Sequence, residues 1–249
     1  MRTPILAGNW KMHKTIDEAI KMVSELKVKV ADVKDRQVIV CPVFTALSRV
    51  HEFIKDSNIE LGAQNVHWEQ KGAFTGEVSV EMIRDTGCKY IIIGHSERRQ
   101  YFGETDETVN KRVNAVFSGN LLPIVCVGET LQEREKDLTF KVVEKQVHNG
   151  LKGLGEDVIS SLIVAYEPVW AIGTGKTATP EQAEEVHKFI RDLLKRMYGE
   201  GASHAIRILY GGSVKPSNVK ELMSKENIDG GLVGGASLDA ESFSQIIKY

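Results

Sequence analysis

The alternation of short apolar runs with amphipathic segments is the feature that most limits what this chain can fold into. The β-prone runs are Ile5–Gly8, Gln37–Cys41, Ile59–Ala63, Lys89–Ile93, Leu121–Val127, Leu162–Ala165, Ile206–Leu209 and Gly231–Val233. They are too uniformly apolar for a strand with one wet face. This pattern predicts a parallel sheet that is covered by helices.

The segments between these runs carry helix start signals and apolar residues at helical spacing. Thr15 and Glu18 form a capping box ahead of one apolar stripe. A second box pairs Thr179 with Gln182, and Pro180 suits the first turn of that helix. Other helical faces are marked by Val109, Val113, Val116 and Phe117, by Val142, Val143 and Val147, and by Val186, Phe189, Ile190, Leu193 and Leu194.

Eight strand–helix units within 249 residues are typical of an α/β fold, the closed (β/α)8 barrel with eight parallel strands surrounded by helices. A doubly wound open sheet is the alternative, because strand spacing does not prove that the sheet closes. No Ser/Gly linker or change in composition divides the chain. We therefore expect residues 1–249 to form a single domain.

The charge balance and the cysteines indicate which partners and which cellular compartment to expect. Lys and Arg number 32 and Asp and Glu 34, so we expect no basic surface for nucleic acid or membrane. No apolar stretch approaches the length of a membrane span, and the first residues predict no signal peptide. Cys41, Cys88 and Cys126 have neither disulfide-like nor metal-ligand spacing. These features indicate a cytoplasmic protein.

Polar side chains follow several of the predicted strands. Active sites of such folds gather at the carboxyl ends of the strands. Asn9 and Lys11 follow the first strand, His95 follows the fourth and Glu167 follows the sixth. Each has an ordinary explanation on its own, as a solvated charge, a helix-start histidine or a turn residue. Their shared placement on one rim favours a reactive site.

Glycine pairs follow the seventh and eighth strands, at residues 211–212 and 234–235. Glycine lets backbone N–H groups approach an anion, and barrels often hold phosphate at these two loops. Gly175-Lys176-Thr177 resembles the end of a nucleotide-binding P-loop. However, Trp170 stands where that motif needs glycine, and the helix is delayed to Thr179. The glycine pairs therefore predict a phosphate site without a P-loop.

The connection after Glu167 is unusually long. Pro168 ends the strand and the next helix begins only after Thr179, so about a dozen residues intervene where about two to six are typical. Such loops are usually binding loops or lids. We expect residues 168–178 to form a lid over the carboxylate.

Eight sequence motifs of the chain are similar to those of one enzyme family. They are GNWKM at Gly8–Met12, AQN at Ala63–Asn65, GAFTGE at Gly72–Glu77, GHSERR at Gly94–Arg99, CVGE at Cys126–Glu129, AYEPVWAIGTGKTATP at Ala165–Pro180, YGGS at Tyr210–Ser213 and LVGGASL at Leu232–Leu238. The chain resembles the triose-phosphate isomerase family over essentially its whole length. The resemblance implies interconversion of dihydroxyacetone phosphate and D-glyceraldehyde 3-phosphate in glycolysis and gluconeogenesis, without a metal or organic cofactor. An aldolase on a barrel and a non-catalytic phosphate-binding protein are the alternatives.

The resemblance also implies residue roles. Glu167 is the base that moves a proton between two carbons, and His95 is the neutral electrophile, as is described for this family. Lys11 and Asn9 stabilise the oxyanion and the phosphate, and Glu97 is placed to pair with Lys11. The implied substrate-binding residues are Asn9, Lys11, Gly173, Ser213, Gly234 and Gly235.

Further residues are implied around this site. The supporting set is Ser96, Glu97, Glu129, Trp170, Ile172, Tyr210 and Leu232. Ile172 and Leu232 would lie over the base. Trp170 and Glu129 match a pair that forms when the lid is open, whereas Tyr210 helps to hold it closed.

A second long connection, residues 65–79, contains Thr75 and Phe74. On its own it reads as a surface loop. The resemblance implies that it inserts into a second copy of the chain, where Thr75 approaches Asn9 and Lys11 of the partner subunit. We therefore expect a homodimer, the commonest soluble assembly.

Overall fold

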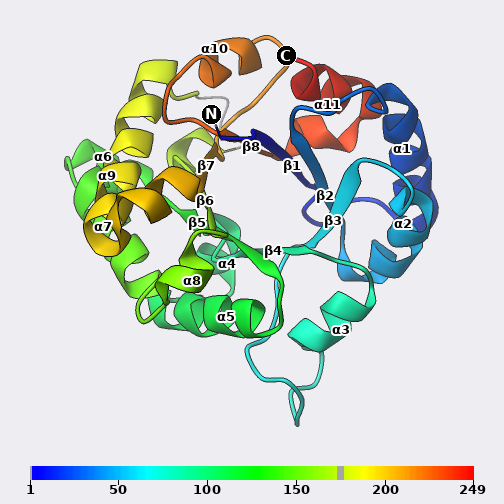
Figure 1. Cartoon of the computed structure of the whole chain (residues 1–249), viewed down its shortest axis with the longest axis horizontal. Helices are drawn as coiled ribbons and strands as arrows, with labels where there is room; N and C mark the ends of the chain where they lie inside the picture. Colours follow the sequence, from blue (N-terminus) through cyan, green and yellow to red (C-terminus); the bar gives the residue numbers. More distant parts are fainter. Residues whose placement is uncertain (1, 173–176) are drawn as a thin grey trace.

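The computed structural model describes residues 2–172 and 177–249. Within these residues, the strands are β1 Ile5–Asn9, β2 Gln37–Cys41, β3 Ile59–Ala63, β4 Tyr90–Ile93, β5 Leu122–Val127, β6 Ile163–Tyr166, β7 Arg207–Tyr210 and β8 Gly230–Val233. All neighbours pair in parallel in chain order, and β8 pairs with β1, so the sheet is a closed barrel (Figure 1). The predicted barrel is confirmed and the open-sheet alternative is wrong.

Helices form a ring outside the barrel (Figure 1). The α-helices are α1 Ile16–Lys29, α2 Leu47–Ile54, α3 Val80–Asp85, α4 Ser96–Tyr101, α5 Asp106–Ser118, α6 Leu131–Glu135, α7 Thr139–Gly150, α8 Glu156–Ile159, α9 Pro180–Ala205, α10 Val219–Met223 and α11 Ala240–Ile247. Short 3-10 turns are η1 Phe44–Ala46, η2 Val169–Ala171 and η3 Gly235–Leu238. The capping boxes predicted at Thr15 and Thr179 are both present.

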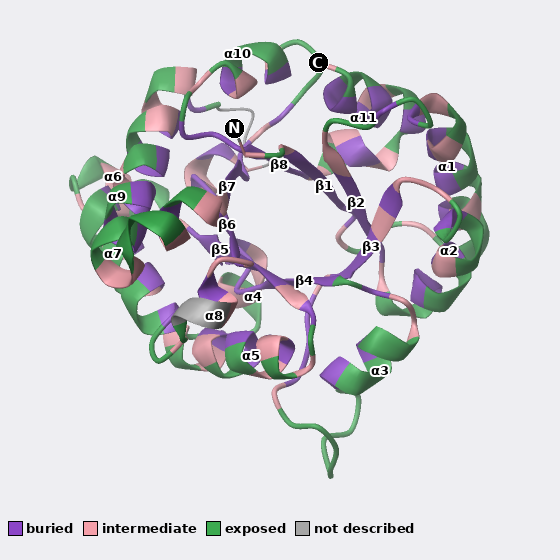
Figure 2. Ribbon diagram, in the orientation of Figure 1, coloured by how far each residue is buried: buried purple, intermediate pink, exposed green. Residues whose placement is uncertain are grey.

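The core has two layers, one inside the barrel and one between the barrel and its helices. On β1, Ile5 and Ala7 belong to the inner cluster, whereas Leu6 belongs to the outer one. Because successive side chains of a strand point to opposite faces, both faces are buried (Figure 2). This explains the uniformly apolar strands, and it makes the barrel interior a packed core.

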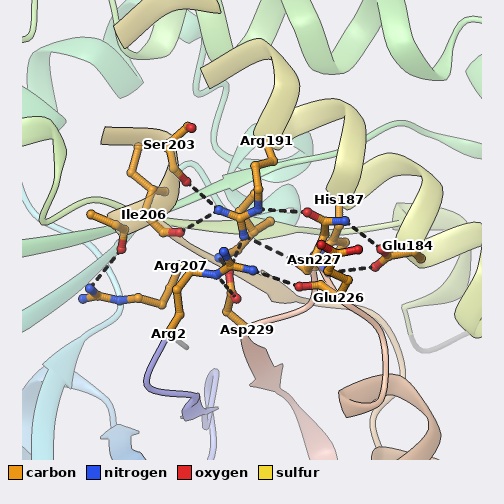
Figure 3. A network of polar contacts seen from close by, with 12 residues as sticks. Arg2, Glu184, His187, Arg191, Ser203, Ile206, Arg207, Glu226, Asn227 and Asp229 are labelled. Carbon is orange, nitrogen blue, oxygen red and sulfur yellow. Dashed lines mark hydrogen bonds and ion pairs between the residues drawn. The ribbon is translucent and has the colours of Figure 1, made fainter. Parts of the chain in front are cut away.

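A buried charge network closes the end of the barrel at which the strands begin (Figure 3). Arg191 of α9 contacts the Asp229 carboxylate at 2.5 Å, just before β8. The same carboxylate accepts the backbone N–H of Ile208 at 2.8 Å and is paired with Arg2 at 2.5 Å. One side chain therefore joins α9, β7, β8 and the residues before β1. The opposite rim, where the strands end, is left for the site.

Among the described residues, no helix is both long and apolar enough to cross a membrane.

Candidate active site

A cavity of about 280 Å³ lies at the carboxyl ends of the strands. Its lining comprises Asn9, Lys11, His95, Glu167, Ala171, Ile172, Gly211, Gly212, Ser213, Val214, Lys215, Leu232, Gly234, Gly235 and Ala236. The structure thus brings the four implied catalytic residues together from three separate strand ends. The implied phosphate ligands Ser213, Gly234 and Gly235 share the same cavity, while Gly173 lies outside the described residues.

Glu167 directly follows β6, and only 2% of its surface is exposed. Its Oε2 accepts the backbone N–H of Ser96 at 2.9 Å, and its Oε1 lies 2.8 Å from His95 Nε2. The second contact is within hydrogen-bonding distance, and it helps to stabilise the ionised carboxylate. Burial acts to raise the pKa of Glu167, but His95, the Ser96 amide and Lys11 outweigh it and lower the pKa overall. The carboxylate is therefore ionised at neutral pH and shielded from water.

His95 is the N-cap residue of α4. Its Nδ1 accepts the backbone N–H of Glu97 at 3.2 Å, so the ring proton belongs on Nε2, which faces Glu167. Burial acts to lower the pKa of His95, and the Glu167 carboxylate more than offsets this, so the net shift is upward. The rise in the pKa of His95 requires the Glu167 carboxylate to stay beside the ring. The amide at Nδ1 favours the neutral ring.

Lys11 is held in an unusual backbone conformation with φ of 53°. Asn9 Oδ1 accepts its backbone N–H at 3.0 Å, and Gln64 Nε2 donates to its carbonyl oxygen at 2.8 Å. Its Nζ contacts Glu97 Oε1 at 2.5 Å, so the expected pair is present. The ammonium group is thereby aimed into the cavity from a strained turn. Gln64 was missed from the sequence, although it lies in the AQN motif beside β3.

The glycine pair after β8 leaves open space where side chains would otherwise stand, whereas a Cβ on Gly211 or Gly212 would meet Glu167 or Tyr210 within 3 Å. A Cβ on Gly235 would meet nothing within 4 Å, and one on Gly234 would meet only Lys11 Cε at 3.6 Å. Packing therefore does not demand glycine there, whereas access of an anion to the backbone N–H groups does. Lys215 also lines this part of the cavity. Lys215 was not among the residues predicted from the sequence. The only indication there is its place as a basic residue two positions after Ser213.

The described ends of the β6–α9 connection contact groups around the cavity. Trp170 Nε1 donates to Glu129 Oε1 at 2.9 Å, and the Tyr166 hydroxyl donates to the same buried carboxylate at 3.1 Å. The Tyr210 hydroxyl is buried beside the backbone of Ala178, at the trailing end of the connection. The Trp170–Glu129 pair is the one that the family resemblance associates with an open lid. Residues 173–176 of that lid lie outside the described residues.

Two further residues, Thr75 and Cys126, do not line the cavity. Thr75 is exposed on the β3–α3 connection, which protrudes from the body of the molecule (Figure 1). Cys126 is fully buried on β5, and burial raises the pKa of its thiol, which disfavours the reactive thiolate. In the part of the chain that the structure describes, no group of three or more His, Cys, Asp or Glu residues is arranged to hold a metal ion.

Comparison with known proteins gives a consistent result. The family model described as triosephosphate isomerase matches residues 4–249. The triosephosphate isomerase of Endomicrobium trichonymphae is 62% identical over 249 residues, which is 100% of this chain and 99% of that protein. That of Moorella thermoacetica is 60% identical, with the same coverage. The crystal structure of the Bartonella henselae enzyme superposes with a TM-score of 0.89 at 38% identity, covering 98% of this chain and 97% of that one.

Proposed function

This chain belongs to the triosephosphate isomerase family, and on that premise we propose how its rim cavity carries out the reaction. The protein is an isomerase that interconverts dihydroxyacetone phosphate and D-glyceraldehyde 3-phosphate, a step of glycolysis. The aldolase alternative is thereby set aside. What remains to be proposed is the role of each residue.

Glu167 is the base. It removes a proton from the carbon beside the carbonyl group and returns it to the neighbouring carbon, through an enediolate intermediate. Its ionised state and its burial support this role, because a poorly solvated carboxylate is a more effective proton acceptor. To reach a substrate carbon it must leave the Ser96 amide. That movement also removes the charge that raises the pKa of His95.

His95 and Lys11 stabilise the charge that develops on the substrate oxygens. The Nε2–H of His95 donates to the carbonyl oxygen as it becomes an enediolate oxygen, which is the described role of the family's neutral histidine. Retention of the neutral ring is supported by the Glu97 N–H on Nδ1. Lys11 adds a fixed positive charge, and Asn9 adds an amide donor.

The phosphate is held at the opposite side of the cavity. Backbone N–H groups of Gly234, Gly235 and Ser213 supply the donors, and Gly173 supplies another by resemblance. No residue in this scheme requires a metal. Residues 168–178 close over the bound substrate, and Ile172 covers the base. Exclusion of water strengthens the fixed dipoles and protects the enediolate.

The single observation that carries this proposal is the buried Glu167 carboxylate beside His95 Nε2 within the cavity that Lys11 lines. The test is a coupled isomerase assay with glyceraldehyde 3-phosphate in the presence of EDTA. We expect Glu167→Gln to lower kcat by about 10²- to 10⁴-fold, because the amide cannot accept the proton. Glu144→Gln, the same change at an exposed site on α7, is the matched control. Near-normal turnover of Glu167→Gln, or loss of wild-type activity in EDTA, would refute the mechanism.

We also propose that the protein is a single-domain, cytoplasmic homodimer. The protruding β3–α3 connection exposes 43% of Phe74, and Met12, beside the catalytic Lys11, is 91% exposed. Large apolar side chains at such positions suit a protein interface. Three buried free cysteines suit a reducing compartment.

A further inference from the structure

Gln146 of α7 forms two hydrogen bonds with a single residue of the barrel rim, and it has no place in the reaction described above. Its Oε1 accepts the backbone N–H of Gly128 at 2.7 Å, and its Nε2 donates to the carbonyl oxygen of Gly128 at 3.0 Å. Gly128 directly follows β5. One side-chain amide therefore satisfies both backbone polar groups of the residue at which the strand ends.

On the side of β6, Gly128 is bracketed by backbone hydrogen bonds. The carbonyl oxygen of Val127 accepts the N–H of Glu167 at 2.8 Å, and that of Glu129 accepts the N–H of Val169 at 3.1 Å. Gly128 lies between them against the Glu167 backbone, since a Cβ placed on it would stand 1.8 Å from the Glu167 carbonyl oxygen. The backbone of the proposed base is therefore set against the end of β5.

On the other edge of β5, the sheet no longer provides partners for Gly128. The register of β4 with β5 ends at Ile93 and Val125. The N–H and C=O groups of successive strand residues point to opposite edges, so those of Gly128 face away from β6. Backbone groups that are shielded from water need partners, and Gln146 supplies them in place of a strand.

The helix holds this amide in a fixed place. Val143 and Val147 of α7 are buried in the outer core layer, and Gln146 lies on the same side of the helix, three residues after Val143. The Gln146 side chain is itself half-buried. Two hydrogen bonds to one residue fix both the position and the orientation of the strand end. Reacting groups need such support, because they must be held to within about 0.5 Å.

We propose that Gln146 is a positioning residue that fixes the end of β5 and, through it, the backbone of Glu167. The inference rests on the proposed role of Glu167 as the base. The contacts run from Gln146 to Gly128 and from Gly128 to Glu167, and no step passes through the substrate. Loss of the two hydrogen bonds leaves the Gly128 groups without partners, so the strand end shifts. The Glu167 carboxylate then loses its alignment with the substrate carbon.

The first test removes the two hydrogen bonds. Gln146→Met keeps the length of the side chain and neither donates nor accepts as the amide does. We expect it to lower kcat for glyceraldehyde 3-phosphate by about three- to thirtyfold, with KM changed by less than about twofold. Asn149→Leu, which removes an amide from an exposed position of the same helix, is the matched control and should match wild type. An unchanged kcat in Gln146→Met, or a rise in KM as large as the fall in kcat, would overturn the proposal.

A second variant carries the same test if Gln146→Met does not fold. Gln146→Asn keeps an amide that is one methylene group too short to reach both groups of Gly128. We expect its kcat to fall as well, and an unchanged kcat would overturn the proposal.

Inhibition by inorganic phosphate distinguishes positioning of the base from damage to the whole rim. The proposed phosphate ligands Ser213, Gly234 and Gly235 follow other strands than β5 and β6. The inhibition constant of inorganic phosphate should therefore agree within about twofold between wild type and Gln146→Met. Phosphate inhibition weakened as much as kcat would overturn the proposal.

A double-mutant cycle shows whether Gln146 acts through Glu167. In a Glu167→Gln background, the effect of Gln146→Met on log kcat should shrink by at least about half, because a base that has been removed cannot be misplaced. Additive losses would overturn the proposal. The proposed chemistry fails separately, since it is refuted by an active Glu167→Gln variant. An inactive Glu167→Gln together with a wild-type-like Gln146→Met would refute only the role of Gln146.

Discussion

Replacement of His187, a fully buried residue of α9, should flatten the loss of stability that the protein undergoes in acid. The pKa of His187 is lowered from 6.5 to about 3, chiefly by burial and also by the nearby Arg191 cation. The carbonyl groups of Asn227 and Ile208 act against this shift but do not cancel it. The folded state therefore excludes a proton that the unfolded chain accepts.

The sign and size of the effect follow from proton linkage. Because the folded pKa lies below the unfolded one, this contribution to stability is fully present above about pH 6.5 and is lost as the pH falls toward about 3. Within that window the free energy of unfolding declines by about 1.4 kcal/mol per pH unit. By about pH 4.5 His187 alone should have cost about 2.7 kcal/mol relative to neutral pH.

The measurement is urea unfolding of wild type and His187→Gln at a series of pH values. The protein concentration is held fixed, because self-association would make stability depend on it. Glutamine does not titrate, so the difference in unfolding free energy between the two proteins should shrink or reverse by about 2.7 kcal/mol between neutral pH and about pH 4.5. Ile190→Val removes apolar packing but no titrating group, and its curve should run parallel to wild type. Parallel curves for wild type and His187→Gln would refute the assignment of His187 as a buried neutral base.

Two further predictions concern the base and the interface. Gly128→Ala would place a Cβ 1.8 Å from the Glu167 carbonyl oxygen, so the end of β6 must shift. We expect this shift to lower kcat by about 10²-fold in the coupled assay. An unaffected kcat would show that the strand end tolerates the shift. Thr75→Arg on the protruding connection should weaken dimerisation and activity together, measured by sedimentation and by the same assay. A fully active, dimeric Thr75→Arg variant would remove the role assigned to this connection.

The architecture could be predicted closely because its signals are local. Every predicted strand overlaps the observed one, and β2 and β3 match at both ends. Thr15 and Thr179 cap helices as their capping boxes indicate. Such signals depend on neighbours within a few residues, so the sequence displays them directly.

The gathering of the site could be predicted because of a rule of topology. Parallel strands place their carboxyl ends on one rim, so residues that follow different strands must converge. Asn9, Lys11, His95 and Glu167 line one cavity for this reason. Their roles in the reaction remain predictions until the variants are assayed.

The chain by itself determined the fold class and indicated which polar side chains gather on one rim, because apolar periodicity, caps and strand-end residues are properties of short segments. Only the tertiary structure decided how those side chains are tuned and held. The Nδ1 contact that favours a neutral His95, the Gln64 support of Lys11 and the packing of His187 between two tyrosines are examples. The last two join residues far apart in the chain, and all three depend on angles and distances of a few ångströms. No periodicity encodes such contacts, since they exist only once the barrel has closed and the helices have packed around it.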